Sequence, residues 1–550
     1  MLTRPCLALA ALLCFPPAPL LAQHDHDVMA SGDSAGPPPL YRNLGTLHRA
    51  IHTSSAGAQK YFDQGLRLTY AFNHGEAIRA FQYAAALDST CAMCWWGIAN
   101  ALGPNINDPM HPEAVAPAFE AVEHAQRLAG QEGPADRALI EAAAARYVEK
   151  PPEDRSPLDS AYADKLRAAT KRFPGDPDIG ALFAESMLDL RPWNQWKHDG
   201  TPQPGTLEAV AALERVIAKY PNHPGACHFY IHAVEGSSRP ERAVPCAKRL
   251  PALMPGAGHL VHMPAHIALR LGDYAAAIQH NQHAVHADQV YLDGPHTESI
   301  YGVAYYAHNW HFLSVAAAFA GRRELALDAA RQTAQAIPME IAKQVPPVEF
   351  WLTIPYYAMV RFGMWNELLA EPAPAADLRY ANAMWHYGHG MAQVAKGELD
   401  LARQDADSLD AIRHAMPPDA AAGIQRADLL LGLAGETLTG QIAAKQGDDA
   451  GAVTHLQEAV SLGDQLSYDE PTPEYIPARQ FLGTELLRQG KAKAAEAVFR
   501  EDLKEHRENG WSLDGLARAL VAEKRTVEAG AVRERLRRAW GAADYRLDDE

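Results

Sequence analysis

Helical periodicity is the feature that most limits what this chain can fold into. From about residue 41 onward, apolar residues recur three or four positions apart, and Gly, Pro or Asp-Gly breaks arrive every 12 to 20 residues. We find no convincing alternating pattern of a half-buried strand. Ala, Leu, Glu and Arg are frequent, and all four are good helix formers. The sequence therefore predicts an all-α fold.

The predicted helices form similar pairs. Small and aromatic residues recur at equivalent places: Gly65, Ala77, Phe81, Ala84, Leu87 and Asp88; Gly272, Ala277 and Ala284; Leu482, Gly483, Gly490, Ala495 and Phe499. This spacing resembles the tetratricopeptide repeat (TPR), a unit of about 34 residues with two antiparallel helices. The resemblance covers about two thirds of residues 57–545 and implies an α-α superhelix, a TPR-like solenoid.

Irregularities in the repeat predict how the array is divided. Residues 103–200 carry longer helices with Pro-rich breaks, and a second break lies at Glu371-Pro372-Ala373-Pro374. We therefore expect one TPR-like solenoid over residues 41–370 and a C-terminal one over residues 375–545. A closed, decorated superhelix is favoured over a uniform ribbon.

The first residues are typical of an export signal. A positive charge at Arg4 precedes an apolar run from Cys6 to Leu21, and the sequence turns polar after Ala22. This order predicts a signal peptide over residues 1–22, cleaved after Ala22, and a periplasmic or secreted protein. A lipoprotein site at Cys14 is disfavoured because Leu13 is not small. Residues 23–40 are polar and rich in Gly and Pro, which predicts a flexible leader. No later stretch is long and apolar enough for a transmembrane span.

Four cysteines remain after removal of the signal peptide. An even number in an oxidising compartment suggests two disulfides, and local pairing gives Cys91–Cys94 and Cys227–Cys246. A redox-active Cys91/Cys94 pair is the alternative, but no βαβ pattern surrounds it. The net charge of −17 argues against nucleic-acid binding, which needs a basic surface.

Histidines gather in the middle of the array. Of the 25 in the chain, 12 lie between His223 and His311. Three predicted helices carry eight candidate ligands on single faces: His228, His232 and Glu235 on Ala226–Gly236; His259, His262 and His266 on Gly258–Gly272; His308 and His311 on Ala307–Gly321. In the repeat register these positions match those that line the concave groove of TPR proteins. The resemblance thus implies that all eight side chains face one hollow.

Imidazole and carboxylate together are typical transition-metal ligands, with zinc or copper the best candidates. Adjacent helices pack about 8–10 Å apart, so His228 with His262 and His232 with His266 form matched pairs. The number of histidines is similar to that of type-3 dicopper proteins, but neither the sequence order nor the fold matches.

Three functions stay open on the sequence alone. The first is an exported protein that binds a metal ion in the groove. The second is a metalloenzyme in which Glu235 is the general base of a metal-activated water. The third is a TPR scaffold that binds a peptide or protein partner in a polar, pH-sensitive groove.

Overall fold

The structure is a computed structural model that describes residues 37–296 and 300–547. The predicted signal peptide and residues 23–36 of the predicted leader lie outside the described residues. Of the last four leader residues, Pro38 and Pro39 accept hydrogen bonds from side chains of the first helix. Pro38 is buried, and the hydroxyl of Tyr61 donates a hydrogen bond of 2.9 Å to its carbonyl.

Residues 41–55 are not helical, so the prediction of helix from residue 41 is wrong for this stretch. The segment crosses the first repeats and is held by Arg49, which lies 2.6 Å from Asp136, 3.1 Å from Asp176 and 2.8 Å from Asp178. Burial alone would lower the pKa of Arg49, but the three carboxylates raise it above its usual value. These ion pairs join residues that are far apart in the sequence, so no local pattern indicates them. They hold residues 41–55, which we call the strap, in place.

The first half of the chain is a series of helical hairpins. Its elements are α2 (Ala56–Tyr70), α3 (His74–Leu87), α4 (Ala92–Ala101), η1 (Pro112–Ala114), α5 (Val115–Leu128), η2 (Ala129–Gln131), α6 (Pro134–Arg146), α7 (Ser156–Arg172), α8 (Pro177–Asp189), α9 (Thr206–Lys219), α10 (Pro224–Glu235), η3 (Pro240–Ala243), α11 (Val244–Leu253), α12 (Gly258–His262), α13 (Pro264–Leu271) and α14 (Tyr274–Leu292).

The second half continues the hairpins and adds one short antiparallel strand pair that the sequence does not predict. Its elements are the π-helix η4 (Gly302–Tyr306), α15 (Ala307–Phe319), α16 (Arg323–Gln335), α17 (Met339–Gln344), η5 (Pro346–Val348), α18 (Glu349–Leu352), α19 (Ile354–Arg361), α20 (Trp365–Ala370), α21 (Arg379–Lys396), α22 (Leu399–Ala415), β1 (Ala421–Ala422), β2 (Gln425–Arg426), α23 (Ala427–Gln446), α24 (Asp449–Gly463), α25 (Ala478–Arg488), α26 (Ala492–Glu505), α27 (Gly510–Ala522) and α28 (Thr526–Ala539).

Glycine and phenylalanine interlock neighbouring hairpins in the manner of TPR units. A Cβ at Gly65 would lie 2.7 Å from the ring of Phe81, and the same ring also fills the space at Gly97 of the next helix pair. Near the other end, Phe499 occupies the same place between Gly483 and Gly515. Both sets have a spacing of 16 residues from glycine to ring to glycine. The all-α, TPR-like superhelix is therefore confirmed.

We expect Gly65→Ala to destabilise the fold by about 1–3 kcal/mol, although alanine is the better helix former, because Phe81 is buried between two helices and cannot move away. Gly130→Ala is the matched control, since a Cβ added there would meet no packed neighbour within 4 Å, and it should change stability by less than about 0.5 kcal/mol. Urea unfolding of both variants checks this. Equal stability of the two variants would contradict the interlock.

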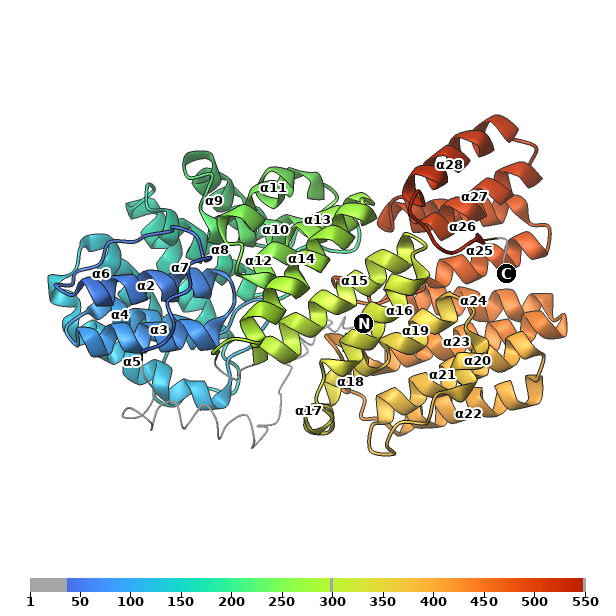
Figure 1. Cartoon of the computed structure of the whole chain (residues 1–550), viewed down its shortest axis with the longest axis horizontal. Helices are drawn as coiled ribbons and strands as arrows, with labels where there is room; N and C mark the ends of the chain where they lie inside the picture. The colour runs from blue at the N-terminus through green and yellow to red at the C-terminus, as the bar shows by residue number, and fades with distance from the viewer. Residues whose placement is uncertain (1–36, 297–299, 548–550) are drawn as a thin grey trace, which may run out of the picture.

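The two halves of the molecule have separate cores that meet in its centre. One cluster of buried apolar residues extends from Leu44 to Tyr305, and a second extends from Ala265 to Tyr545. Figure 1 shows the corresponding arrangement, with α2–α14 in one half and α16–α28 in the other. The second core includes residues on both sides of 371–374, so the hydrophobic core is continuous where the sequence places a boundary.

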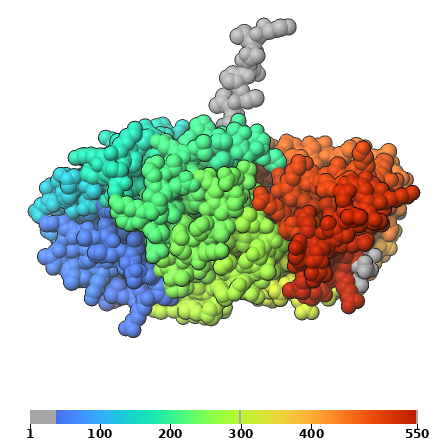
Figure 2. All heavy atoms as spheres, turned by 90° about the horizontal axis from the view of Figure 1, so that it is seen from above, coloured from blue at the N-terminus to red at the C-terminus, as the bar shows by residue number. Residues whose placement is uncertain are grey.

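The C-terminal helices fold back on the middle of the chain and close the superhelix. The indole of Trp511 donates to the carbonyl of Ala318, and that of Trp540 donates to Phe319, both at 3.0 Å. The hydroxyl of Tyr274 donates to Arg507 at 2.6 Å. Figure 2 shows the red C-terminal surface against the green surface of the central helices.

A buried ion pair near this contact gives the fold a pH-dependent contribution. His506 Nδ1 lies 2.9 Å from Asp502 Oδ1. Burial alone would lower the pKa of His506, but the charge and hydrogen bond of Asp502 raise it above the usual value. Because the folded pKa is raised, the extra stability is fully present below the unfolded pKa of about 6.5 and is lost as pH rises through the folded pKa.

We therefore expect the difference in unfolding free energy between wild type and His506→Gln to be largest near pH 6. It should then shrink by up to about 1.4 kcal/mol per pH unit as the pH rises. Urea unfolding at a series of pH values measures it. A difference that stays constant from pH 6 to pH 9 would contradict the ion pair.

The cysteines follow the sequence prediction only in part. Cys91 and Cys94 form a disulfide across the start of α4. Cys227 and Cys246 are both buried and carry free thiols, and the Cys227 thiol donates to the carbonyl of Pro221. The expected Cys227–Cys246 disulfide is thus not formed, although the two helices bring the residues together. Among the described helices, none is long and apolar enough to cross a membrane.

Candidate metal centre

Three neighbouring repeats bring seven of the eight predicted residues together. Helix α10 presents His228, His232 and Glu235. The predicted single helix Gly258–Gly272 is divided into α12 and α13 before Pro264, which has no N–H to donate. Met263 nevertheless keeps right-handed helical angles, φ −50° and ψ −34°. The face that carries His259, His262 and His266 therefore continues across the division, and His308 approaches from α15.

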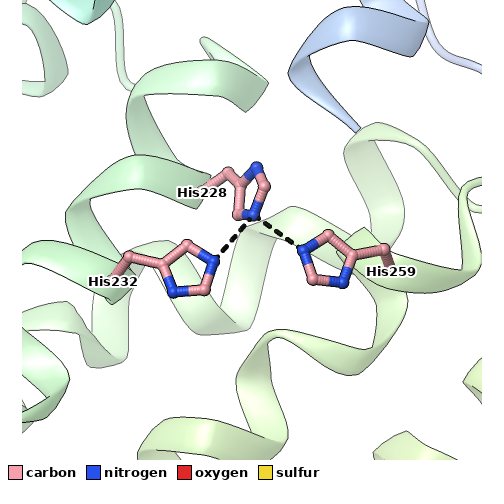
Figure 3. A group of neighbouring side chains, drawn as sticks. All are labelled: His228, His232 and His259. Carbon is pink, nitrogen blue, oxygen red and sulfur yellow. Dashed lines mark hydrogen bonds between the residues drawn. The ribbon is translucent and has the colours of Figure 1, made fainter. Parts of the chain in front are cut away.

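One group of three histidines joins α10 to α12. The Nε2 atom of His228 lies 3.2 Å from Nε2 of His232 and 3.0 Å from Nε2 of His259. Figure 3 shows the three rings converging on one point with these nitrogens innermost. We call His228, His232 and His259 the first triad. Its ligand atoms all lie within 4.8 Å of one another.

A second group joins α12, α13 and α15. The Nε2 atom of His262 lies 2.7 Å from Nε2 of His266 and 3.0 Å from Nε2 of His308. We call these three residues the second triad, which also meets the 4.8 Å limit. The triads are adjacent, with ring centroids 5.6 Å apart for His232 and His266.

Glu235 connects the two triads. Its Oε1 lies 2.8 Å from Nδ1 of His232, and its Oε2 forms a short hydrogen bond with Nδ1 of His266. Burial alone would raise the pKa of Glu235, but His266 and His232 hold it at about 2. In return, the carboxylate outweighs burial and raises the pKa of His266. Glu235 is therefore an anion inside the protein, shared by two imidazoles.

Backbone and amide oxygens hold two further histidines from behind. His228 Nδ1 lies 2.8 Å from the carbonyl oxygen of Tyr70, and His262 Nδ1 lies 2.6 Å from Oδ1 of Asn281. The amide of Asn281 is itself oriented, because its Nδ2 donates to the carbonyl of Ala277 at 2.8 Å. Asn281 is not among the residues predicted from the sequence, because it lies alone on α14 with no motif around it.

The triads lie in a buried site, whereas the resemblance to TPR proteins implies side chains that line a concave groove. The first triad and His262, His266 and Glu235 are each at most 2% exposed, and His308 is half-buried. Burial, followed by the neighbouring imidazoles, lowers the pKa of His228, His259, His262 and His308 well below the usual value. Aromatic side chains fill the space that the repeat register assigns to the groove.

Two of these aromatic residues have unusual backbones. Phe72 has φ 55° and Trp193 has φ 59°, in the left-handed region that residues other than glycine rarely adopt. The Phe72 ring contacts His228 at 4.5 Å between centroids, and Trp193 meets His232 at 5.5 Å. Phe312 covers the second triad in the same way, 4.9 Å from His262. Backbone strain of this kind is found preferentially at functional sites.

His311 is the one predicted residue that the structure places apart. It is buried and packs against Phe350 with ring centroids 5.5 Å apart, and burial lowers its pKa to about 3. Among the described residues it belongs to none of the ligand groups. One helical turn separates it from His308, which points to the second triad.

A segment from the far end of the chain covers the site. Tyr468 packs over Gly236, at the end of α10, and against Arg270 of α13. The adjacent carboxylate of Glu470 is buried, and its pKa is raised to about 7 by burial and then by the charge of Glu235. No sequence pattern links this segment, some 200 residues away, to the histidines.

Comparisons with known proteins give no family. No family model matches the chain, and no curated protein matches it. Similar solved structures include the human IFIT1 dimer with PPP-AAAA, 13% identical, with a TM-score of 0.34 over 89% of this chain and 91% of that one. Yeast Tom70 is 11% identical, with a TM-score of 0.33 over 87% of this chain and 99% of that one. The APC/C Cut9-Hcn1 tetramer is 12% identical, with a TM-score of 0.32 over 89% and 78%. Structural similarity at this level does not indicate a ligand or a partner for this chain.

Proposed function

We propose that this protein is an exported TPR-like protein that binds a transition metal, zinc or copper, at the histidine cluster of α10, α12, α13 and α15. The observation that carries the proposal is the convergence of buried imidazole Nε2 atoms at 2.7–3.2 Å. Buried polar atoms are normally hydrogen-bonded, and imidazole suits zinc and copper well. The hydrogen bonds behind the rings are those that orient metal ligands in proteins.

The alternative functions have less support from the geometry. A scaffold would bind its peptide in a groove at these positions, yet the side chains there are buried under Phe72 and Phe312. A metalloenzyme with Glu235 as general base needs a free carboxylate oxygen, yet both oxygens accept hydrogen bonds from histidines. Metal binding without an assigned reaction is therefore the function best supported.

We expect the untagged mature protein to contain near-stoichiometric zinc or copper, and the double variant His232→Ala/His266→Ala to lose it, because each triad loses a ligand. Elemental analysis of purified protein measures the content. His283→Ala is the control, since His283 is exposed on α14 and should leave the metal content unchanged. Absence of metal in wild type, with none gained on dialysis against zinc or copper, would reject the proposal and favour the scaffold.

Export is a separate part of the proposal and rests on residues 1–22. We expect the protein recovered from the periplasm or culture medium to begin at Gln23, because the small Ala22 precedes the polar leader. Intact-mass measurement identifies the first residue. Recovery of a chain that retains the whole apolar run, Cys6 to Leu21, in the cytoplasm would contradict export.

A further inference from the structure

The six histidines face each other in two separate sets of three, with a carboxylate behind both. We propose that the cluster holds two transition-metal ions side by side, one bound by the Nε2 atoms of the first triad and one by those of the second. Glu235 is then a positioning residue shared by both ions and not a ligand. This inference rests on the proposed metal-binding function and specifies its stoichiometry.

The hydrogen bonds behind the rings decide which nitrogen carries the proton. The Nδ1 atoms of four of the six histidines lie against oxygens that can only accept. These oxygens belong to the Tyr70 carbonyl, the Asn281 amide and the Glu235 carboxylate, which accepts from two rings. Each of these Nδ1 atoms is therefore protonated, and in the neutral ring the lone pair is on Nε2.

Those lone pairs point into the triads. Both members of the His228–His232 pair and of the His262–His266 pair have Nδ1 engaged in this way, and their facing Nε2 atoms are 3.2 and 2.7 Å apart. When both rings of such a pair are neutral, their Nε2 atoms are two acceptors that repel at these distances unless a proton or a cation lies between them. A cation coordinated by all three rings removes this conflict in each triad at once.

The distances fit ligation after a small expansion. Three nitrogens bound at 2.0–2.1 Å to one ion lie about 3.3–3.6 Å from each other. The contacts that His228 and His262 make within their triads are 2.7–3.2 Å, so these nitrogens need to separate by less than about 1 Å, within reach of small side-chain rotations. The third distance in each triad lies within 4.8 Å.

One ion cannot serve both triads. Two nitrogens on opposite sides of a single ion are at most about 4.2 Å apart. Among the described residues the two triads stay separate groups even at 4.8 Å. The third group within that limit, His232, Glu235 and His266, joins the triads through the Nδ1 hydrogen bonds described above. In this third group, Glu235 therefore orients one histidine of each site and does not form a third metal site.

Three nitrogen ligands leave each ion a coordination position for a small molecule such as water. The ligand chemistry is uniform, with neutral imidazoles and no thiolate, and the surrounding shell is aromatic. Copper(I) and zinc both accept such a set. Glu235 supplies one negative charge near two cations, and Glu470 and Asp469 lie close enough to add to it.

Titration of the metal-free full-length protein with zinc, and anaerobically with copper(I), tests whether the cluster binds two ions. We expect two ions per chain in wild type and one in each of His228→Ala/His259→Ala and His262→Ala/His308→Ala. His283→Ala should keep both, and circular dichroism verifies that each variant is folded. One bound ion in wild type, or loss of all metal in either double variant, would overturn the two-ion proposal but leave the proposed metal binding intact. No binding at all refutes the proposed function as well.

Loading with copper(II) adds a spectroscopic readout. Adjacent copper(II) ions interact, so the electron paramagnetic resonance spectrum of wild type should be broadened or weaker than its copper content requires. Each double variant should show the full signal of an isolated ion. An isolated-ion spectrum from wild type that accounts for all of its copper overturns the side-by-side arrangement.

Glu235→Gln tests the shared positioning role. His232 and His266 bond to different oxygens of Glu235, and glutamine replaces one of these oxygens by an NH2 group that cannot accept. We therefore expect two ions with about 10–100-fold weaker binding. Loss of one ion would make Glu235 a ligand and overturn its assigned role. Asp288→Asn is the matched control: Asp288 is a buried acid bonded to Tyr301 and Asn309, and its variant should bind both ions as wild type does.

Discussion

The carboxylate of Glu235, placed between His232 and His266, is the interaction on which the centre of this molecule depends. It joins α10 to α13, two helices of successive repeats, and it does so where the side chains are almost fully buried. An isolated carboxylate in such a place would be very costly, whereas one with two imidazole donors is stable as an anion. The position of this anion fixes the orientation of one ring in each triad. The Tyr70 carbonyl and the Asn281 amide then orient a second ring in each triad.

The fold could be predicted because its determinants are local and repeated. Gly65 and Phe81 recur as Gly483 and Phe499, since a ring on one helix needs glycine on the helix it meets. In the central repeats, the register set by the small residues Ala243, Ala277 and Ala326 also placed His228, His232, His259, His262, His266 and His308 on faces that converge. The strap at residues 41–55 was mistaken for helix, because Arg49 is held by carboxylates 87 to 129 residues away. Helical periodicity reflects only local spacing and gives no information on such a long-range contact.

The histidine cluster was predictable in its members but less so in its surroundings. Helical spacing assigned His311 to the groove, yet it packs on Phe350 because the side chains of a helix spread over more than one neighbour. Asn281 and the carbonyl of Tyr70 have no sequence signature, since any acceptor at the right distance can orient an imidazole. The resemblance to TPR proteins implied a concave groove, and the bulk of Phe72, Trp193 and Phe312 fills that space with packed aromatic rings.

Closure of the superhelix explains why this interior lies where it does. An open TPR array would leave the histidine faces in contact with water, and each repeat would interact only with its neighbours. Here Trp511 and Trp540 bind the end of α15, and the segment around Tyr468 lies over the end of α10. The second triad also lies between the two hydrophobic cores, with α13 and α15 contributing to the later one. The histidines are therefore enclosed by both halves of the chain, so that the C-terminal half contributes to shielding the cluster from water along with the helices that carry the histidines.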